Sequence, residues 1–327
     1  MKNLLLAGLI SLVVSLILGI ITIPVLRKIK FGQPILKYVE THKDKNGTPT
    51  MGGLFFIISA VLVFLLFGGF SGRVSTVSVA IGLAFMLVGF IDDFIKVKFG
   101  TNQGLKSYQK IIFQLAIAIT AGFFAYVNRI TLFHIPFANL TVDFGFFTIP
   151  VIVLIFIAMT NSVNLTDGLD GLAGSVSVAY LISIILLIST QISNSSMVFL
   201  GSKEYSNLNL LSACLIGAIL GFLFFNVNKA KVFMGDTGSL SLGGFLAGIS
   251  VFSLNSLFIP IVGIMFVLSS ISVIVQVFHF KRTKKRVFLM APLHHHFQLK
   301  GNTESKIAYC YTLITFVMGG LCIIFAI

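Results

Sequence analysis

Charged side chains are scarce in this sequence. Lys, Arg, Asp and Glu together make up 10% of the 327 residues, whereas 57% of the residues are hydrophobic, and the mean hydropathy is +1.03. These values lie far outside the range of soluble globular domains. The scarcity of charge therefore excludes an ordinary soluble domain and predicts an integral membrane protein.

Long apolar segments fill the chain from end to end. A helix needs about 20 mostly apolar residues to cross the hydrocarbon core of a bilayer. Ten segments approach this length, of which the fifth and eighth are short: 4–26, 53–70, 74–91, 111–127, 147–159, 172–192, 208–225, 240–254, 257–280 and 307–327. We expect an all-α polytopic membrane protein with about ten transmembrane helices.

Cysteines are rare and linker sequences are missing. Cys214, Cys310 and Cys322 lie in apolar segments without paired spacing, which argues against a disulfide framework or a thiolate metal site and predicts buried structural cysteines. No Pro/Ser-rich linker interrupts the apolar segments, and no convincing internal repeat is present. We therefore expect residues 1–327 to form a single integral-membrane domain.

Basic residues are distributed unevenly between the loops. All but four of the 23 Lys and Arg residues fall in loops that follow odd-numbered segments. Because loops rich in Lys and Arg face the cytoplasm, both termini are predicted to lie outside. On that outer side, the alternation of bulky apolar and polar residues in 129–144 predicts a small β-hairpin.

Five aspartates lie at predicted cytoplasmic ends of the apolar segments: Asp92, Asp93, Asp167, Asp170 and Asp236. Carboxylates near the membrane are costly without partners and indicate functional sites. Each one could instead cap a helix or pair with a local lysine. Five such residues in three separate loops are better explained by one shared site.

The segment from Asp92 to Lys96 reads DDFIK. If the helix continues through it, Lys96 lies four residues after Asp92 and three after Asp93, so its ammonium can approach either carboxylate. The two aspartates point about 100° apart on a helix and should have different roles. Two carboxylates about 4 Å apart repel by roughly 4 kcal/mol at an effective dielectric of 20, which favours a cation nearby.

The segment from Asn161 to Gly171 reads NSVNLTDGLDG. Its four polar side chains recur at every third position, which spreads them over half the circumference of a regular α-helix. They share one site only if the helix tightens or breaks, as Gly168 and Gly171 would allow. A structural polar stripe that joins helices is the alternative.

Two glycine-containing segments precede apolar segments. NKAKVFMGDTGSLSLGG, residues 228–244, places Asp236 where it could cap a helix, or where neighbouring glycines could bring backbone N–H groups to an anion. THKDKNGTPTMGG, residues 41–53, resembles a phosphate-binding turn but lacks the P-loop pattern. A nucleoside-triphosphate site of the P-loop type is therefore not predicted.

Three consecutive histidines occur in APLHHHFQLKG, residues 291–301. Zinc-binding histidines are usually spaced so that two can face one ion, whereas consecutive ones point apart. We expect His294, His295 and His296 to bind a polar ligand or its phosphates, with a plain interfacial loop as the alternative. Carboxylate and amide ligands without thiolates select a hard cation such as Mg²⁺, which completes its shell with water and substrate phosphates. Together with lysines in four loops and a membrane location, this ligand set predicts phosphoryl or phosphosugar transfer that involves a lipid.

The motifs TMGG, DDFIK, NSVNLTDGLDG, VFMGDTGS and PLHHHF, in this order, resemble those of the polyprenyl-phosphate N-acetylhexosamine-1-phosphate transferases. The HHH segment is similar to the branch of that family that uses UDP-MurNAc-pentapeptide. The resemblance runs from about residue 43 to about residue 301. It implies ten helices, both termini outside, a bacterial plasma membrane location and a cytoplasmic site. The implied Mg²⁺-dependent reaction converts UDP-MurNAc-pentapeptide and undecaprenyl phosphate to undecaprenyl-diphospho-MurNAc-pentapeptide (lipid I) and UMP.

The resemblance also implies roles for individual residues. Asp92 and Asp93 match the family's aspartate pair and Asp236 its third essential acid, with Asp236 and Asp93 expected at the metal. The positions expected to contact the nucleotide or other polar parts of the substrates are Lys45, Thr50, Lys96, Lys110, Asn161, Asn164, Leu165, Asp167, Gly168, Asp170, Asn226, Phe233, Gly235, Gln276, His294, His295 and His296. Gln298 follows HHHF where many members are expected to carry Glu.

Two other functions remain open from the sequence. A sibling enzyme that moves GlcNAc-1-phosphate would use the same acids and differ in its sugar-recognition loop around His294 to His296. An ion-coupled transporter would place ionisable residues in the middle of its spans, whereas every aspartate here lies at a predicted end. The sequence leaves a homodimer open, and no nucleic-acid partner is predicted.

Overall fold

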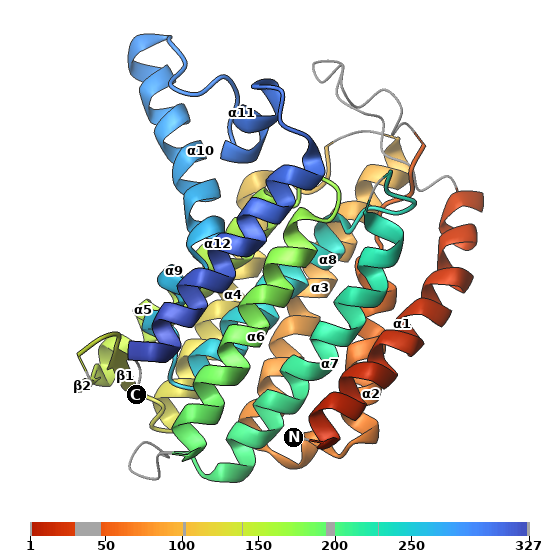
Figure 1. Ribbon diagram of the computed structural model, residues 1–327. Helices are drawn as coiled ribbons and strands as arrows, with labels where there is room; N and C mark the ends of the chain where they lie inside the picture. The colour runs from red at the N-terminus through yellow and green to blue at the C-terminus, as the bar shows by residue number, and fades with distance from the viewer. Residues whose placement is uncertain are drawn as a thin grey trace.

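The computed structural model describes residues 2–29, 47–100, 103–138, 140–193, 200–227 and 229–325. Within these residues the chain is almost entirely helical (Figure 1). The helices are α1 (Lys2–Lys28), α2 (Gly53–Leu66), α3 (Arg73–Phe99), α4 (Ser107–Val127), α5 (Thr148–Thr166), α6 (Leu172–Ser193), α7 (Ser202–Asn226), α8 (Gly235–Phe252), α9 (Ile259–Val262), α10 (Ile264–Thr283), α11 (Leu293–Leu299) and α12 (Glu304–Phe325). Short 3₁₀ turns lie at Gly69–Ser71, Gly145–Phe147 and Ser256–Phe258.

Eight of the described helices are long and apolar enough to cross a membrane, namely α1, α3 to α7, α10 and α12. Two further helices occupy predicted spans: α2 is shorter, at 14 residues, and α8 is rich in glycine and serine. The prediction of an all-α polytopic membrane protein is confirmed.

Several predicted spans have different ends in the structure, and the third continues to Phe99. The fifth extends to Thr166 and the eighth begins at Gly235, because polar side chains in these turns find partners inside the bundle and allow the helix to continue. The ninth is interrupted at Gly263, between α9 and α10. Hydropathy alone locates neither the polar helix ends nor this break.

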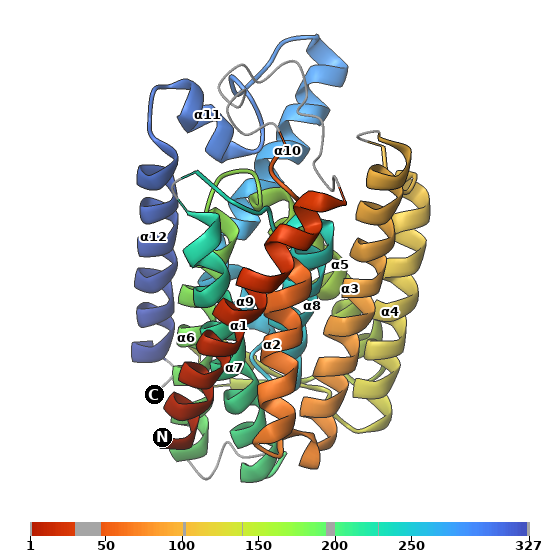
Figure 2. The same cartoon turned by 90° about the vertical axis from the view of Figure 1, so that its right-hand side faces the viewer.

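Helix α8 lies at the centre of the bundle, and from Thr237 to its end every residue is buried. It packs on α3, α5 and α2, while α1 packs on α7 (Figure 2). The contact between α3 and α8 is close at its upper end, since a Cβ on Gly89 would collide with the backbone carbonyl of Asp236. This approach brings the end of α3 directly against the beginning of α8.

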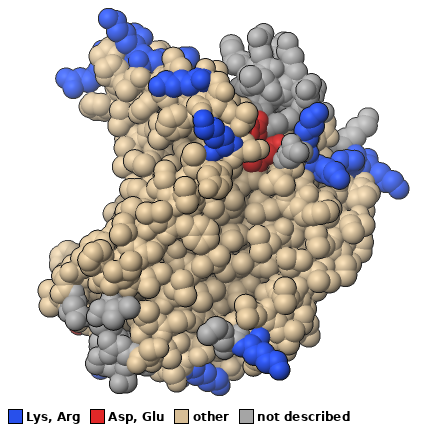
Figure 3. Space-filling model, in the orientation of Figure 1, with Lys and Arg blue, Asp and Glu red and all other residues tan. Residues whose placement is uncertain are grey.

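The two ends of the bundle differ in character. Both termini lie at one end, and α10 and α11 extend from the other (Figures 1 and 2). Figure 3 shows Lys and Arg gathered mainly at the α10–α11 end, near a small acidic patch, above a wide belt without charge. The sequence predicted that most Lys and Arg residues lie on one side of the membrane, and this distribution agrees with that prediction.

The predicted hairpin and the cysteines can both be checked. Strands β1 (Leu132–Ile135) and β2 (Leu140–Asp143) pair antiparallel near the terminal end of the bundle, which confirms the hairpin. Cys214 and Cys322 are buried, but Cys310 is exposed. The prediction that all three are buried was wrong for Cys310, because an apolar helix facing lipid presents apolar residues on its outer face as well as its inner one.

Candidate active site

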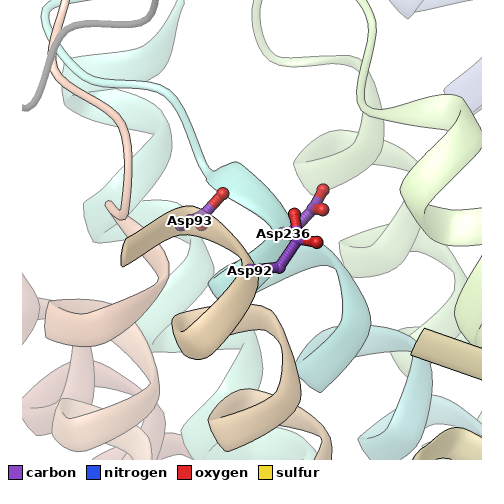
Figure 4. Close-up of side chains that lie close together, drawn as sticks. All are labelled: Asp92, Asp93 and Asp236. Carbon is purple, nitrogen blue, oxygen red and sulfur yellow. The ribbon is translucent and has the colours of Figure 1, made fainter. Parts of the chain in front are cut away.

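Three carboxylates meet at the α10–α11 end of the bundle. Asp92 and Asp93 lie in the last two turns of α3, and Asp236 is the second residue of α8. One oxygen atom from each carboxylate lies within 4.8 Å of an oxygen atom of the other two. Among the described residues, this is the one group of three or more His, Cys, Asp or Glu side chains that are close enough together to hold a metal ion. Figure 4 shows Asp92 and Asp236 side by side, with Asp93 turned toward the start of α8.

The turn before α8 depends on Gly235. Its φ angle is +71°, a left-handed conformation that glycine adopts without strain. A Cβ at this position would lie 2.5 Å from Asp93 Oδ2 and 2.6 Å from the buried Thr50 Oγ1. Backbone hydrogen bonds hold this turn to the chain that enters α2, with Gly52 N donating to Phe233 O at 2.8 Å and Phe233 N to Pro49 O at 2.8 Å.

Two lysines neutralise part of the cluster. The Lys96 ammonium lies 2.6 Å from Asp92 Oδ2, 3.0 Å from Asp236 Oδ2 and 3.7 Å from Asp93 Oδ1. Lys110, on α4, lies 2.7 Å from Asp236 Oδ2. The expected approach of Lys96 to both adjacent aspartates is confirmed, and the lysine also reaches the third acid across the helix interface.

Asp92 and Asp93 have different partners. Asp92 Oδ1 accepts a hydrogen bond from Leu105 N at 2.8 Å, in the loop between α3 and α4. Asp93 Oδ2 accepts two, from Thr237 N at 2.9 Å and Thr237 Oγ1 at 2.7 Å. Asp93 therefore caps the amino end of α8, where backbone N–H groups lack helical partners. Asp236 itself is not the cap, contrary to the simplest interpretation of its sequence position.

Asn164 and Asn161 reach the cluster from α5. Asn164 Nδ2 donates to Asp236 Oδ1 at 2.7 Å and to Ser239 Oγ at 2.8 Å. Asn161, one turn earlier, lies beside the cluster and donates to Gln114 Oε1 on α4. The site thus combines side chains from α3, α4, α5 and α8.

A polar cavity of about 660 Å³ opens beside the cluster. Its lining includes Asp92, Lys96, Lys110, Asn161 and Asp236, together with residues 103–107. Its size is that of a small-molecule site, and its walls carry both carboxylates and ammonium groups. Such a cavity can bind a phosphorylated ligand and hold a proton acceptor beside it.

The donor set of the cluster fits a hard divalent cation. Three carboxylates face two ammonium groups, so one negative charge remains in excess. The Lys96 ammonium lies among all three carboxylates, where a positive charge is favoured. Oxygen ligands without thiolates or histidines suit Mg²⁺ or Ca²⁺ rather than a softer metal.

The end of α5 breaks as the glycines of its motif predicted. The helix ends at Thr166, and Gly171 has a φ of +74°. Burial, together with the nearby carboxylates of Asp236, Asp93 and Asp170, raises the pKa of the Asp167 carboxyl to about 8. The four polar residues of the motif do not share one point: Asn161 and Asn164 lie at the cluster, whereas Asp170 faces a different cavity.

The second cavity, of about 470 Å³, lies between the loop after α5, the loop after α7 and α12. Asp170, Lys229 and Glu304 supply its charged walls. Asp170 Oδ2 accepts a hydrogen bond from Ala230 N at 2.9 Å. Asn226 ties the two loops together, since its Oδ1 accepts from Gly171 N at 2.9 Å and its Nδ2 donates to Val232 O at 2.9 Å.

Consecutive spacing predicted that the three histidines point apart, and this was wrong for two of them. The rings of His294 and His295 lie 4.4 Å apart, and both Nε2 atoms approach the position that a Cβ on Gly168 would take. His294 is fully buried against Gly168, where a Cβ would collide with its Nε2. Burial, together with the neighbouring His295, lowers the pKa of His294 to about 3. His295 Nδ1 lies 3.1 Å from Gln298 Oε1, and His296 Nδ1 accepts a hydrogen bond from Leu289 N at 3.2 Å. At position 298, where Glu was expected, the neutral side chain of Gln298 is thus a hydrogen-bond partner of His295.

The remaining predicted residues have supporting positions. Gln276 accepts hydrogen bonds from Val287 N and Phe288 N and so holds the segment before α11. Leu165 and Phe233 are partly buried, in the last turn of α5 and the turn before α8. Lys45 lies outside the described residues.

The sequence analysis missed several residues at the site. Gln114, Thr237, Ser239 and the loop 103–107 all contact the residues named above. Gln114 follows Lys110 by four residues and is a polar residue within an apolar span, a signal that could have identified it. The contacts of Thr237 and Ser239 depend on how α8 packs against α3 and α5 and had no such signal.

The fold and the site define the class of this protein as a polytopic membrane transferase, and comparisons with known proteins agree. The sequence model of glycosyl transferase family 4 matches residues 75–254, and phospho-N-acetylmuramoyl-pentapeptide-transferase signature 1 matches residues 45–57. A phospho-N-acetylmuramoyl-pentapeptide-transferase of Clostridium botulinum is 44% identical over 95% of this chain and 91% of its own length. Relatives of the same name from Desulfitobacterium hafniense and Clostridioides difficile are 42% and 40% identical over 99% and 97% of this chain and 97% and 96% of their own lengths. The chain belongs to the phospho-N-acetylmuramoyl-pentapeptide-transferase family.

Proposed function

We propose that the chain transfers phospho-MurNAc-pentapeptide from UDP-MurNAc-pentapeptide to undecaprenyl phosphate, which gives lipid I and UMP. One observation carries the proposal: Asp92, Asp93 and Asp236 converge with Lys96 and Lys110 at a cavity of about 660 Å³. The same chain is 40–44% identical, over nearly its full length, to proteins named phospho-N-acetylmuramoyl-pentapeptide-transferase.

The proposed reaction is a direct displacement. Asp92 orients the phosphate of the lipid or accepts its proton, and a phosphate oxygen attacks the β-phosphorus of the UDP-sugar. A new P–O bond forms to the lipid phosphate as the bond to the UMP oxygen breaks, and UMP leaves with the electron pair. Lys110 and Lys96 border the cavity, where their charges favour phosphate and the developing negative charge on the leaving group.

We assign Mg²⁺ as the cofactor, held by Asp236 and Asp93. When bound, the ion supplies positive charge that neutralises the diphosphate. Asp93 keeps Oδ1 for this purpose, because its Oδ2 is engaged by Thr237. Lys96 lies among the same carboxylates and offsets the repulsion between Asp92 and Asp236.

The nucleotide and sugar are assigned to the loops beside the cluster. The residues proposed to contact or shape this part of the site are Lys45, Thr50, Asn164, Leu165, Asp167, Gly168, Asp170, Asn226, Phe233, Gly235, Gln276, His294, His295 and His296. Support comes from the way Asn226 joins the loop after α5 to the loop after α7. A nucleoside between these loops would place its diphosphate toward the lysines.

We further propose that the site faces the cytoplasm of a bacterial cell and that the whole chain is one domain. The gathering of Lys and Arg at the α10–α11 end supports the orientation. A hydrophobic core that includes residues from Ala7 to Cys322 supports the single domain. The lipid acceptor can then enter from the inner leaflet while the soluble UDP-sugar arrives from the cytoplasm.

The direct test measures UMP release by the purified full-length protein with Mg²⁺. Release should require both undecaprenyl phosphate and UDP-MurNAc-pentapeptide, should not occur with UDP-GlcNAc, and should be lost in Asp92→Asn and Asp236→Asn. No release from UDP-MurNAc-pentapeptide by the wild-type protein would sink the proposal.

The route of transfer is tested separately, because an aspartate could instead attack first and form a covalent phosphosugar enzyme. Direct displacement requires that no radiolabelled sugar phosphate become attached to the protein when the lipid is omitted. It also requires that labelled UMP not exchange into the UDP-sugar under the same conditions. Trapped label or lipid-independent exchange would replace the direct route with the covalent one.

A further inference from the structure

A buried glutamine lies behind the wall of the active-site cavity. Gln114, on α4, is fully buried and follows Lys110 by one turn and a fraction, on the face that packs against α5. Its Oε1 accepts a hydrogen bond from Asn161 Nδ2 at 2.8 Å. Its Nε2 is buried and has no hydrogen-bond partner.

The orientation of both amides follows from one backbone group. Asn161 Nδ2 also donates to Ile157 O at 2.8 Å, and because a carbonyl oxygen only accepts, the Asn161 atom beside it must be nitrogen. The Gln114 atom that faces this nitrogen must then be oxygen. Neither amide can flip without bringing two acceptors or two donors together.

This arrangement leaves one polar atom of each residue unused. Both hydrogens of Asn161 Nδ2 are already engaged, by Ile157 O and Gln114 Oε1. Asn161 lines the cavity, so the atom that it has left to present there is its carbonyl oxygen. The charged groups that line the same cavity are ammonium groups and carboxylates, which bind phosphate and cations rather than the neutral donors of a sugar.

The unpartnered Gln114 nitrogen has a cost. A buried polar group without a partner destabilises a fold, and an apolar side chain of similar shape would avoid that penalty. A glutamine that served only to join α4 to α5 would be expected to use both ends of its amide. Its presence with one end unsatisfied indicates that the accepting end has a function.

We propose that Gln114 is a positioning residue. It holds Asn161 with its carbonyl oxygen toward the cavity, where that oxygen accepts a hydrogen bond from an O–H or N–H group of the UDP-sugar. The inference rests on the proposed transferase function and deepens it. Gln114 touches no substrate and acts through Asn161.

The test substitutes Gln114 by methionine, which has a similar length and no hydrogen-bonding amide. The kcat/KM of Gln114→Met for UDP-MurNAc-pentapeptide should fall about 3- to 10-fold, the loss expected for one misplaced hydrogen bond. The KM for undecaprenyl phosphate should not change. The thermal unfolding midpoint in detergent should change little, because removal of the unsatisfied nitrogen offsets the loss of the hydrogen bond from Asn161. Gln114→Glu keeps an accepting oxygen in either protonation state and should recover most of the lost kcat/KM.

A double-mutant cycle identifies the route of the effect. Asn161→Ala should lower kcat/KM at least as much as Gln114→Met, and the double variant should be no worse than Asn161→Ala alone. If the two losses simply multiply, Gln114 does not act through Asn161 and the inference is wrong. An unchanged kcat/KM in Gln114→Met also overturns it.

Gln191, near the carboxyl end of α6, provides a matched control. It is buried and pairs with Asn255 in both directions, with Gln191 Nε2 donating at 3.1 Å and Asn255 Nδ2 donating back at 3.2 Å. Gln191→Met should therefore lower the unfolding midpoint and leave kcat/KM unchanged, the reverse of Gln114→Met. If both variants behaved alike, Gln114 would be an ordinary helix contact.

The proposed function and this inference fail in different ways. A wild-type protein that releases no UMP from UDP-MurNAc-pentapeptide overturns both. An active wild-type protein whose Gln114→Met variant keeps the wild-type kcat/KM and loses stability overturns the positioning role alone.

Discussion

A single oxygen of Asp93, Oδ2, accepts hydrogen bonds from both the backbone N–H and the hydroxyl of Thr237, at 2.9 and 2.7 Å. The pair joins the end of α3 to the first turn of α8 and so fixes Asp236, the residue before Thr237, against the carboxylates of α3. Asp92 instead accepts a hydrogen bond from Leu105 N and pairs with Lys96. The two adjacent aspartates are therefore not equivalent.

Substitution of the two aspartates should separate catalysis from stability. Asp92→Asn should lower kcat by about 10²–10⁴-fold, the contribution typical of a proton-accepting group, and should leave the unfolding midpoint close to that of the wild type. Asp93→Asn should also lower kcat, but it should in addition cost about 1–2 kcal/mol of stability, because a charged cap of α8 becomes neutral. UMP release and thermal unfolding in detergent measure the two effects.

Thr237→Val is the control for this comparison, since it removes only the hydroxyl donor to Asp93. It should reduce stability by about 1 kcal/mol, with a smaller effect on kcat than either aspartate variant. Equal stability of Asp92→Asn and Asp93→Asn would contradict the capping role of Asp93.

Lys96 and a divalent cation should compete for the same three carboxylates. Lys96→Met removes the ammonium that lies among Asp92, Asp93 and Asp236, so the variant should be less stable than the wild type when EDTA is present. Added Mg²⁺ should raise its unfolding midpoint more than that of the wild type, because ligand binding to the folded state stabilises it. Thermal unfolding over a Mg²⁺ titration gives the two curves. Parallel curves would mean that the ion does not bind at this cluster.

The close approach of α3 to α8 should not tolerate a methyl group. Gly89→Ala places a Cβ against the carbonyl of Asp236, and the shift needed to relieve the collision should cost about 1–3 kcal/mol. Because the same shift moves Asp92 away from Asp236, UMP release should fall as well. Gly320, in α12, is the control: a Cβ there meets no atom within 4 Å, so Gly320→Ala should be neutral or stabilise by up to about 1 kcal/mol. Retention of full activity in Gly89→Ala would show that the helix contact is looser than its geometry indicates.

The buried His294 should make the protein sensitive to acid. Its pKa is about 3 when folded, against an ordinary value of 6.5, so below pH 6.5 the unfolded chain binds a proton that the folded state does not. The stability contributed by His294 is therefore present above pH 6.5 and is lost as the pH falls toward 3, by up to about 1.4 kcal/mol per pH unit. His294→Gln should show a shallower decline of the unfolding midpoint between pH 7 and pH 5. Identical slopes for the two proteins would place the acid sensitivity elsewhere.

Much of the fold followed from the sequence because membrane helices are specified locally. Apolar length predicts the spans, the uneven Lys and Arg content of the loops predicts an orientation for the bundle, and the alternation in 129–144 predicted the hairpin. The ends that hydropathy misplaced, at Thr166 and Gly235, are those where polar side chains have partners on other helices. Lateral packing between helices is invisible to a hydropathy count.

Some contacts of the site were likewise predictable from the sequence, and others depend on tertiary packing. The spacing in DDFIK determined that Lys96 can reach both Asp92 and Asp93, since i, i+3 and i, i+4 neighbours share a helix face. Only the tertiary structure decided that Asp236, 140 residues after Lys96, meets the same ammonium, because the approach of α3 to α8 at Gly89 depends on side chains far apart in sequence. The same holds for Thr237 as the partner of Asp93 and for Gln114 as the partner of Asn161. The sequence by itself determined which charges are present and which of them are neighbours on one helix, and the packing of four helices decided which of them form a site.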